Sequence, residues 1–348
     1  MDSKKAIVGA IIQAQLLLLF AFILSGCSAD PHNDDPKEQR QAVESAFTIP
    51  EPDLVPEGIA HDPASGAFFV GSTYKRKVVK IAKDGTISTF AGGDGDMLGP
   101  VGMRVDEARN LLWVNHAAIG DDAPIIDGGS YPYGLSGIAA FDLNSGDRVY
   151  DFFLPVEGEG HFLNDLDIAS DGILFISDTL GRKIYRLDPD QGEFAVIAEM
   201  PDGIYPNGVT LNHDQNALYI ARAGVPGVYR LELETATLIE VEQSADGPLR
   251  GDGLYFDDGA LIAVQPWIED CHVCRFELDA SGTNIVERIP LAGAHSAFLQ
   301  PSTGVIAGDF IYVIANSQLQ HFRKLFLEYG ENYPLDQLKD VVILRVAL

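Results

Sequence analysis

Short alternating strands dominate the hydrophobic pattern of this chain. From about Phe47 to the C-terminus, runs of apolar, β-branched and aromatic residues are separated by Gly, Asp, Asn and Pro. Such runs predict strands joined by turns. Helices are hard to place outside the region 329–338. The pattern therefore predicts an all-β fold.

The predicted strands belong to a unit that recurs along the chain. Each unit has a polar residue, usually followed by Gly, then an apolar strand, a turn and a second strand. Five units are clear, and they begin at Glu57, Val101, Asn164, Asn207 and Asp252. The intervals are 44, 63, 43 and 45 residues, and another 44 residues lead to Ser296. A period in the forties is typical of propeller blades, so the sequence predicts a six-bladed β-propeller.

A propeller has to close its ring between the two ends of the domain. Residues 341–346 form a last apolar strand, and we expect it to pair near Phe47, Thr48 and Ile49, because closure removes exposed sheet edges. The one long interval contains residues 117–136, which we interpret as an insertion inside the second blade.

The first 27 residues differ in composition from the rest of the chain. Lys4 and Lys5 precede an apolar stretch, which ends in Leu24-Ser25-Gly26-Cys27. This is the layout of an export signal, and its last four residues resemble the bacterial lipobox, whose Cys is acylated. An uncleaved membrane anchor is the alternative, because the stretch is nearly long enough to span a bilayer.

These features predict three parts of the chain. Residues 1–27 form a lipoprotein signal peptide in which Cys27 becomes lipidated, residues 28–46 form a flexible tether, and residues 47–348 form the propeller. We therefore expect a protein of the bacterial cell envelope, on its periplasmic or cell-surface side, that contacts the membrane only through an N-terminal lipid anchor.

Charge and cysteine content narrow the function further. The formal charge is -27, with no run of Lys and Arg, so nucleic-acid binding is not expected. Cys271 and Cys274 are the two cysteines of the expected mature domain. Zinc would need more ligands than this segment supplies, which leaves a disulfide or two free thiols.

Residues at the same phase of each repeat converge on the axis of a propeller. Four of the six carry oxygen donors: Glu57, Asn164, Asn207 and Asp252. Calcium takes six to eight oxygen ligands from carboxylates, amide carbonyls and water, so this set predicts a calcium site. The alternative is that Asn-Gly and Asp-Gly are ordinary turn dipeptides, since both residues tolerate left-handed backbone.

The ends of the second strands should lie beside this site. They fall near Thr73, His116, Asp178, Arg222, Trp267 and Asn316. We expect Arg222 to pair with a substrate carboxylate or phosphoryl oxygen and Trp267 to stack on a ring. The alternatives are that Arg222 pairs with acidic residues of the protein surface and that Trp267 has only a packing role.

Four motifs give the chain a resemblance to a known family over roughly residues 56–315. They are Pro56-Glu57-Gly58-Ile59, Leu163-Asn164-Asp165, Pro206-Asn207-Gly208-Val209 and Gly251-Asp252-Gly253-Leu254. They resemble the motifs of the senescence marker protein/gluconolactonase family, which is related to diisopropylfluorophosphatase and more loosely to paraoxonase. The resemblance implies a six-bladed propeller with a catalytic calcium held by Glu57, Asn164, Asn207 and Asp252, and Asp252 as base or nucleophile.

One strand also resembles paraoxonase, but only in part. Leu111-Leu112-Trp113-Val114-Asn115-His116 is similar to a strand that bears one His of the proposed paraoxonase dyad, whereas the other His falls at Val101. His116 is therefore a second catalytic candidate, with a structural role as its alternative. The departure favours a mechanism centred on Asp252.

The sequence thus predicts an enzyme that acts on a small molecule. We expect a calcium-dependent hydrolase of a lactone, aryl ester or phosphoester. No Gly-x-Ser-x-Gly motif occurs, which disfavours serine catalysis. The alternative is a non-catalytic propeller that binds a ligand and uses calcium structurally, because propellers host both roles.

Overall fold

The computed structural model describes residues 43–93, 97–118, 134–156, 158, 160–323 and 334–348. Residues 1–40 form one unit and residues 41–348 a second unit, which holds every described residue. The expected signal peptide, Cys27 and most of the expected tether lie outside the described residues. No helix in the described part of the chain is long and apolar enough to cross a membrane.

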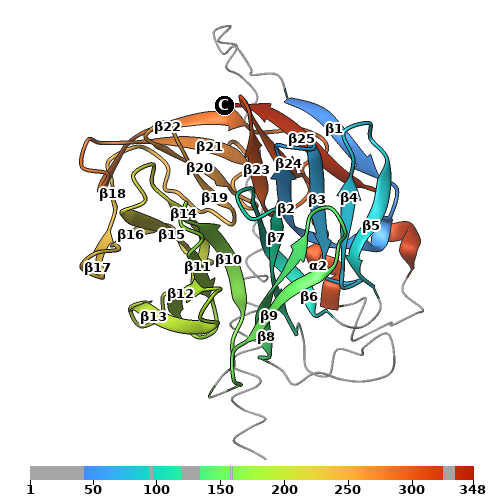
Figure 1. The fold of residues 1–348 in the computed structure, drawn as a ribbon. Helices are drawn as coiled ribbons and strands as arrows, with labels where there is room; N and C mark the ends of the chain where they lie inside the picture. The colour runs from blue at the N-terminus through green and yellow to red at the C-terminus, as the bar shows by residue number, and fades with distance from the viewer. Residues whose placement is uncertain (1–42, 94–96, 119–133, 157, 159, 324–333) are drawn as a thin grey trace, which may run out of the picture. The chain divides into compact units, whose positions relative to one another are not determined.

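Six sheets form the six blades of a β-propeller (Figure 1), which confirms the predicted fold. The inner strands contact one another from blade to blade. From the inner edge outward, the first blade is β2 (Pro56–Asp62), β3 (Ala67–Ser72), β4 (Lys77–Ile81) and β5 (Ile87–Gly92), and the second is β6 (Gly99–Asp106), β7 (Leu111–Ala117), β8 (Ser136–Asp142) and β9 (Arg148–Phe153). The third blade is β10 (Leu163–Ile168), β11 (Leu174–Asp178), β12 (Lys183–Asp188) and β13 (Glu193–Glu199), and the fourth is β14 (Pro206–Leu211), β15 (Ala217–Arg222), β16 (Val228–Glu232) and β17 (Thr237–Glu240). The fifth blade is β19 (Leu254–Asp257), β20 (Ala260–Val264), β21 (Val273–Leu278), β22 (Asn284–Ala292) and β18 (Glu242–Gln243), and the sixth is β23 (Gly304–Ala307), β24 (Phe310–Ile314), β25 (Val341–Ala347) and β1 (Val43–Ile49).

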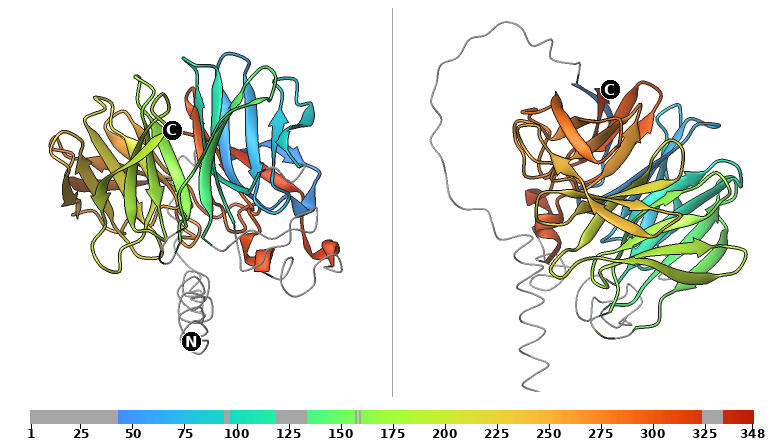
Figure 2. Two further views of the ribbon diagram at one scale, coloured as in Figure 1. Left: turned by 60° about the horizontal axis from the view of Figure 1, so that its bottom comes forward. Right: turned by 90° about the vertical axis from the view of Figure 1, so that its left-hand side faces the viewer.

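The ring closes in the last blade, where β1 becomes the outermost strand. It pairs antiparallel with β25, with Thr48 opposite Val342 and Ile49 opposite Val341, as the sequence predicts. The blue β1 and the red β25 lie side by side in Figure 1, and Figure 2 shows the six sheets from two further directions. β1 begins at Val43, before the expected boundary at Phe47.

Apolar side chains fill the space between neighbouring blades. Alternate residues of β19 face opposite sides: Leu254 packs with Tyr219 of the fourth blade, and Tyr255 packs with Ile311 of the sixth. This alternation follows from the two-residue period of a strand. Each sheet therefore buries both faces only when its neighbours are present.

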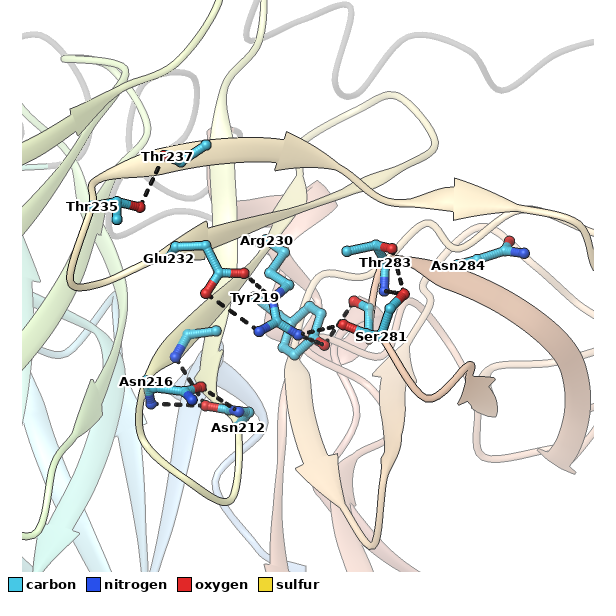
Figure 3. Close-up of polar contacts among 12 residues, drawn as sticks. Asn212, Asn216, Tyr219, Arg230, Glu232, Thr235, Thr237, Ser281, Thr283 and Asn284 are labelled. Carbon is cyan, nitrogen blue, oxygen red and sulfur yellow. Dashed lines mark hydrogen bonds and ion pairs between the residues drawn. The ribbon is translucent and has the colours of Figure 1, made fainter.

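Polar contacts also join the blades. Between the fourth and fifth blades, the Tyr219 hydroxyl donates to the carbonyl of Gly282 at 2.8 Å, and the Arg230 guanidinium donates to the carbonyl of Ser281 at 3.0 Å (Figure 3). Glu232 holds the same guanidinium at 2.7 Å. These bonds fix the turn before β22 against the neighbouring blade.

Two expectations differ from the observed elements. Ser296 lies in the segment between β22 and β23, and the residues that lead into the sixth inner strand are Ser302 and Thr303. A fixed spacing of 44 residues fails here because the fifth blade is longer, with residues 265–272 between β20 and β21 and nine residues in β22. The region 329–338 contributes one 3-10 turn, η4 (Leu335–Gln337), among its described residues, while α2 (Leu319–Arg323) and η1 (Pro52–Leu54) fall elsewhere.

Candidate metal centre

Three of the four predicted oxygen donors lie at bulges in the inner strands. The pairing with the second strand shifts between Pro56 and Ile59, between Leu163 and Leu166, and between Pro206 and Val209. Glu57, Asn164 and Asn207 therefore fall where a strand has an extra residue and its side chain can be aimed away from the sheet. The second blade has the same shift after Pro100, but Val101 is apolar there.

The glycines that follow Glu57 and Asn207 have a packing role. A Cβ on Gly58 would lie 2.0 Å from the carbonyl oxygen of Val101, and one on Gly208 would lie 2.5 Å from that of Asp252. Neither glycine has a positive φ. The Asn-Gly motif at Asn207 is therefore not a left-handed turn; its glycine lets the backbones of neighbouring inner strands approach closely.

Asn207 and Asp252 are in direct contact across two blades. The Nδ2 of Asn207 donates to the Oδ1 of Asp252 at 2.8 Å. A carboxylate oxygen accepts hydrogen bonds, so the amide nitrogen must face it. The Oδ1 of Asn207 and the Oδ2 of Asp252 are then the two oxygens left for another partner.

The amide of Asn164 is oriented in the same way. Its Nδ2 donates to the Oγ1 of Thr179 at 3.0 Å, and that hydroxyl donates to the carbonyl of Pro206 at 2.7 Å. Because the single hydroxyl proton is used at Pro206, Thr179 can only accept from Asn164. The Oδ1 of Asn164 therefore also points away from its protein partner.

Glu57 provides the fourth oxygen. Its Oε2 is buried without a hydrogen-bond partner among the described residues, which is costly for a polar atom. The hydroxyls of Ser302 and Thr303 both donate to its backbone carbonyl, so the sixth blade fixes the position of this residue.

Burial shifts the acidity of the carboxyl groups in the channel. It raises the pKa of Asp252 to about 7, against the effect of the Asn207 hydrogen bond and with a contribution from Asp165. Burial also raises the pKa of Glu57 well above its usual value, and Asp252 and Asp165 add to this rise. Close carboxylates in a buried site favour a proton or a cation as their partner.

This donor set fits a hard cation. Glu57 and Asp252 are close enough for their charges to interact, Asn207 contacts Asp252, and both amide nitrogens are held by protein acceptors. The described residues contain no group of three or more His, Cys, Asp and Glu side chains suited to a metal, so any ion here must use the amides. Oxygen-only coordination favours calcium over zinc or copper.

A buried ion pair under the donors was not predicted from the sequence. Arg104 of β6 approaches Asp165 at 3.6 Å and Asp167 at 3.8 Å, and its guanidinium lies 5.3 Å from the ring centre of Tyr255. Arg104, Asp167 and Tyr255 each follow a repeat position by three residues. A comparison of the repeats at that second phase would have found them.

Asp178, which we expected beside the site, positions Asn164 indirectly. It is fully buried, its Oδ2 contacts the Nδ1 of His161 at 2.6 Å, and its Oδ1 accepts from the amides of Phe162 and Gly181. The Asp178 carboxylate raises the pKa of His161. This group fixes the segment that leads into β10 and so into Asn164.

The structure places His116 in the packing of the second blade. It lies opposite Gly137 on β8, its ring meets Phe153 edge-on at 5.1 Å, and its Nε2 is 3.5 Å from the Oδ1 of Asp151 on β9. Burial lowers its pKa, against the effect of Asp151. These contacts are with the outer strands of its own blade, and none joins it to Asp252 within the described residues.

Arg222 and Trp267, the predicted substrate contacts, are not brought together by any contact in the described ranges. Arg222 ends β15, and its Nη1 donates to Glu240 of β17 at 2.7 Å. Trp267 is 39% exposed in the segment between β20 and β21. Cys271, in the same segment, forms a disulfide with Cys274 of β21.

The comparisons with known proteins show the fold. No family model matches the chain, and no curated protein matches it. A gluconolactonase from Xanthomonas campestris is 18% identical, with a TM-score of 0.56 over 86% of this chain and 88% of its own. Regucalcin from Agrobacterium tumefaciens, a calcium-binding protein, is 16% identical, with a TM-score of 0.55 over 87% and 95%.

The same architecture also carries other chemistry. Virginiamycin B lyase from Staphylococcus aureus is 16% identical, with a TM-score of 0.55 over 88% of this chain and 99% of its own. The gluconolactonase and regucalcin are proteins of the kind that the sequence motifs resemble. At these identities the likeness establishes the propeller, and function has to be argued from the site.

Proposed function

We propose that this protein is a calcium-dependent hydrolase of lactones, aryl esters or phosphoesters, with its active site at Glu57, Asn164, Asn207 and Asp252. The observation that carries the proposal is the orientation of the two amides. Their nitrogens are bound to Asp252 and Thr179, so both carbonyl oxygens are available to an ion beside two carboxylates. The fold shared with a gluconolactonase and a calcium-binding regucalcin supports it.

In the proposed reaction, the metal ion and Asp252 have different roles. Calcium would polarise the scissile carbonyl or phosphoryl oxygen of the substrate. Asn207 holds the Oδ1 of Asp252, which leaves Oδ2 to take a proton from water or to attack the substrate directly. Ser177 has a positioning role instead of a chemical one. Its hydroxyl donates to the backbone carbonyl of Asn207 at 2.7 Å and fixes that strand.

The test is hydrolysis by the purified protein with and without a chelator. We expect turnover of at least one class among lactones, aryl esters and organophosphates, loss of turnover on chelation, and recovery with added calcium. A ligand that binds without turnover would support the non-catalytic alternative. Turnover that survives complete removal of calcium would contradict the proposal.

We also propose that the protein is exported and anchored by a lipid at Cys27. The lipobox supports this, and so does the Cys271–Cys274 disulfide, because disulfides persist in oxidising compartments. We expect wild-type cells to incorporate a labelled fatty acid into the protein and Cys27→Ala to remain an unlabelled precursor. Equal labelling of the two would contradict the anchor.

A further inference from the structure

Arg104 is a permanent cation inside the channel, beneath the candidate metal centre. It lies on the inner strand of the second blade, and its side chain is only 16% exposed. Its guanidinium reaches the face of Tyr255, on the inner strand of the fifth blade. The second and fifth blades lie opposite each other in the ring, with the third and fourth blades between them on one side and the sixth and first on the other. The side chain of Arg104 therefore spans the channel.

The carboxylates beside Arg104 come from one strand of the third blade. Asp165 and Asp167 are two residues apart on β10, and their oxygens lie 3.6 Å and 3.8 Å from the guanidinium. The fourth blade also holds them: the amide of Val209 donates to Asp165 at 3.1 Å, and the amide of Leu211 donates to Asp167 at 2.8 Å. Both carboxylates are therefore fixed in place by backbone groups as well as by Arg104.

Without Arg104, the same position would be rich in oxygen and negative charge. The two carboxylates would keep their backbone hydrogen bonds, and the Oγ1 of Thr210, 3.3 Å from Asp167, would add a hydroxyl oxygen. Fixed carboxylates with a neighbouring hydroxyl suit a hard cation such as calcium. A guanidinium cannot lose its proton in a protein, so in the wild type this position is always filled by a positive charge.

We propose that the Arg104 guanidinium is a built-in counter-ion that closes the channel beneath the metal centre, and that Asp165 and Asp167 form a latent cation site that opens only when this guanidinium is removed. The proposal uses the proposed function only for the first calcium ion. It assigns Arg104 a positioning role: it holds two carboxylates and excludes a second ion, without touching the substrate.

The experiment counts calcium ions per chain by equilibrium dialysis at saturating calcium. We expect one ion in the wild type and two in Arg104→Met, a change that removes the charge and keeps much of the apolar stem. Arg104→Lys keeps a cation and should bind one ion. Arg109→Met is the matched control, because Arg109 also pairs with a carboxylate, that of Asp106 at 3.2 Å, but does so at the surface. The Arg109→Met protein should bind one ion.

The location of the second ion is tested by adding Asp167→Asn to Arg104→Met, which should return the number to one. An Arg104→Met protein that binds no more calcium than the wild type overturns the inference. A wild type that binds no calcium while Arg104→Met binds one ion supports the inference and contradicts the proposed metal centre, so the two failures are distinct.

A further measurement does not depend on the folding of the Arg104 variant. Asp167→Asn alone, in the wild-type background, should leave the number of bound calcium ions unchanged, because Arg104 already neutralises that position. Loss of one ion in Asp167→Asn would show that the carboxylate holds a metal in the wild type, and it would overturn the proposal.

Discussion

Asp252→Asn is expected to lower hydrolysis by roughly 1000-fold, the size of effect typical of a lost general base. The structure gives this change a specific consequence. Asn207 donates to the Oδ1 of Asp252, so the new amide must present its oxygen to Asn207 and place its NH2 group where Oδ2 was. The variant therefore loses both the basic oxygen and one oxygen for the ion. The measurement is turnover together with calcium affinity.

A swapped pair separates these two losses. Asn207→Asp combined with Asp252→Asn keeps the net charge of the site and restores a hydrogen bond between an amide and a carboxylate. We expect it to recover calcium binding but not turnover, because the carboxylate then lies on the fourth blade instead of the fifth. Recovery of turnover in the swapped pair would mean that the position of the carboxylate is unimportant, and the mechanism would be wrong.

His116→Ala is the comparison for the second catalytic candidate. His116 packs on Phe153 beside Asp151, so its loss should lower stability while turnover by the folded protein falls less than about tenfold. If His116→Ala abolished turnover and Asp252→Asn left it nearly intact, a histidine base would replace the mechanism centred on Asp252.

The fold could be predicted from the sequence because a propeller repeats one local pattern. Each unit carries its own polar start, apolar strand and turn, so the first five inner strands could be located. The closure of the ring was also predictable, since the last apolar strand at 341–346 needs a second neighbour and the strand at Phe47 supplies it. The sixth unit was misplaced at Ser296 because a fixed period cannot account for the longer fifth blade, with its segment 265–272 and its nine-residue β22.

The contacts between blades could not be read from the repeat. The four donors share one phase, which made them predictable as a group, but the hydrogen bond between Asn207 and Asp252 depends on the path of two backbones, that of Asn207 at a bulge. Arg104 and Asp167 share a phase of the repeat, but this spacing does not show that the guanidinium pairs with carboxylates of another blade. His116 shows the converse, since its position at a strand end suggested the mouth of the channel, whereas its ring packs on Phe153 of its own sheet.

The stability of the calcium-free protein should fall as the pH rises from about 4 to 7. Burial raises the pKa of Asp252 in the folded protein to about 7, from a usual value of 3.8. Between these two pKa values the folded state binds more protons than the unfolded state, so the free energy of unfolding decreases with increasing pH. At 1.36 kcal/mol for each pKa unit, Asp252 alone accounts for on the order of 4 kcal/mol.

Chemical denaturation with urea at a series of pH values, after removal of divalent ions, measures this effect. Asp252→Asn should be more stable than the wild type at pH 7 and should show a shallower decline, because it no longer buries that charge. Glu287→Gln, which removes an exposed carboxylate of β22, should follow the wild-type curve.

Calcium should reverse the decline, because an ion that binds only the folded state stabilises it by about 2.7 kcal/mol at a hundredfold excess over its dissociation constant. Its stabilising effect should increase from pH 5 to pH 7 as the carboxyl groups lose their protons. A calcium-free protein with equal stability at pH 5 and pH 7 would contradict the raised pKa of Asp252. It would also mean that the site is open enough to water for its charges to be solvated without an ion.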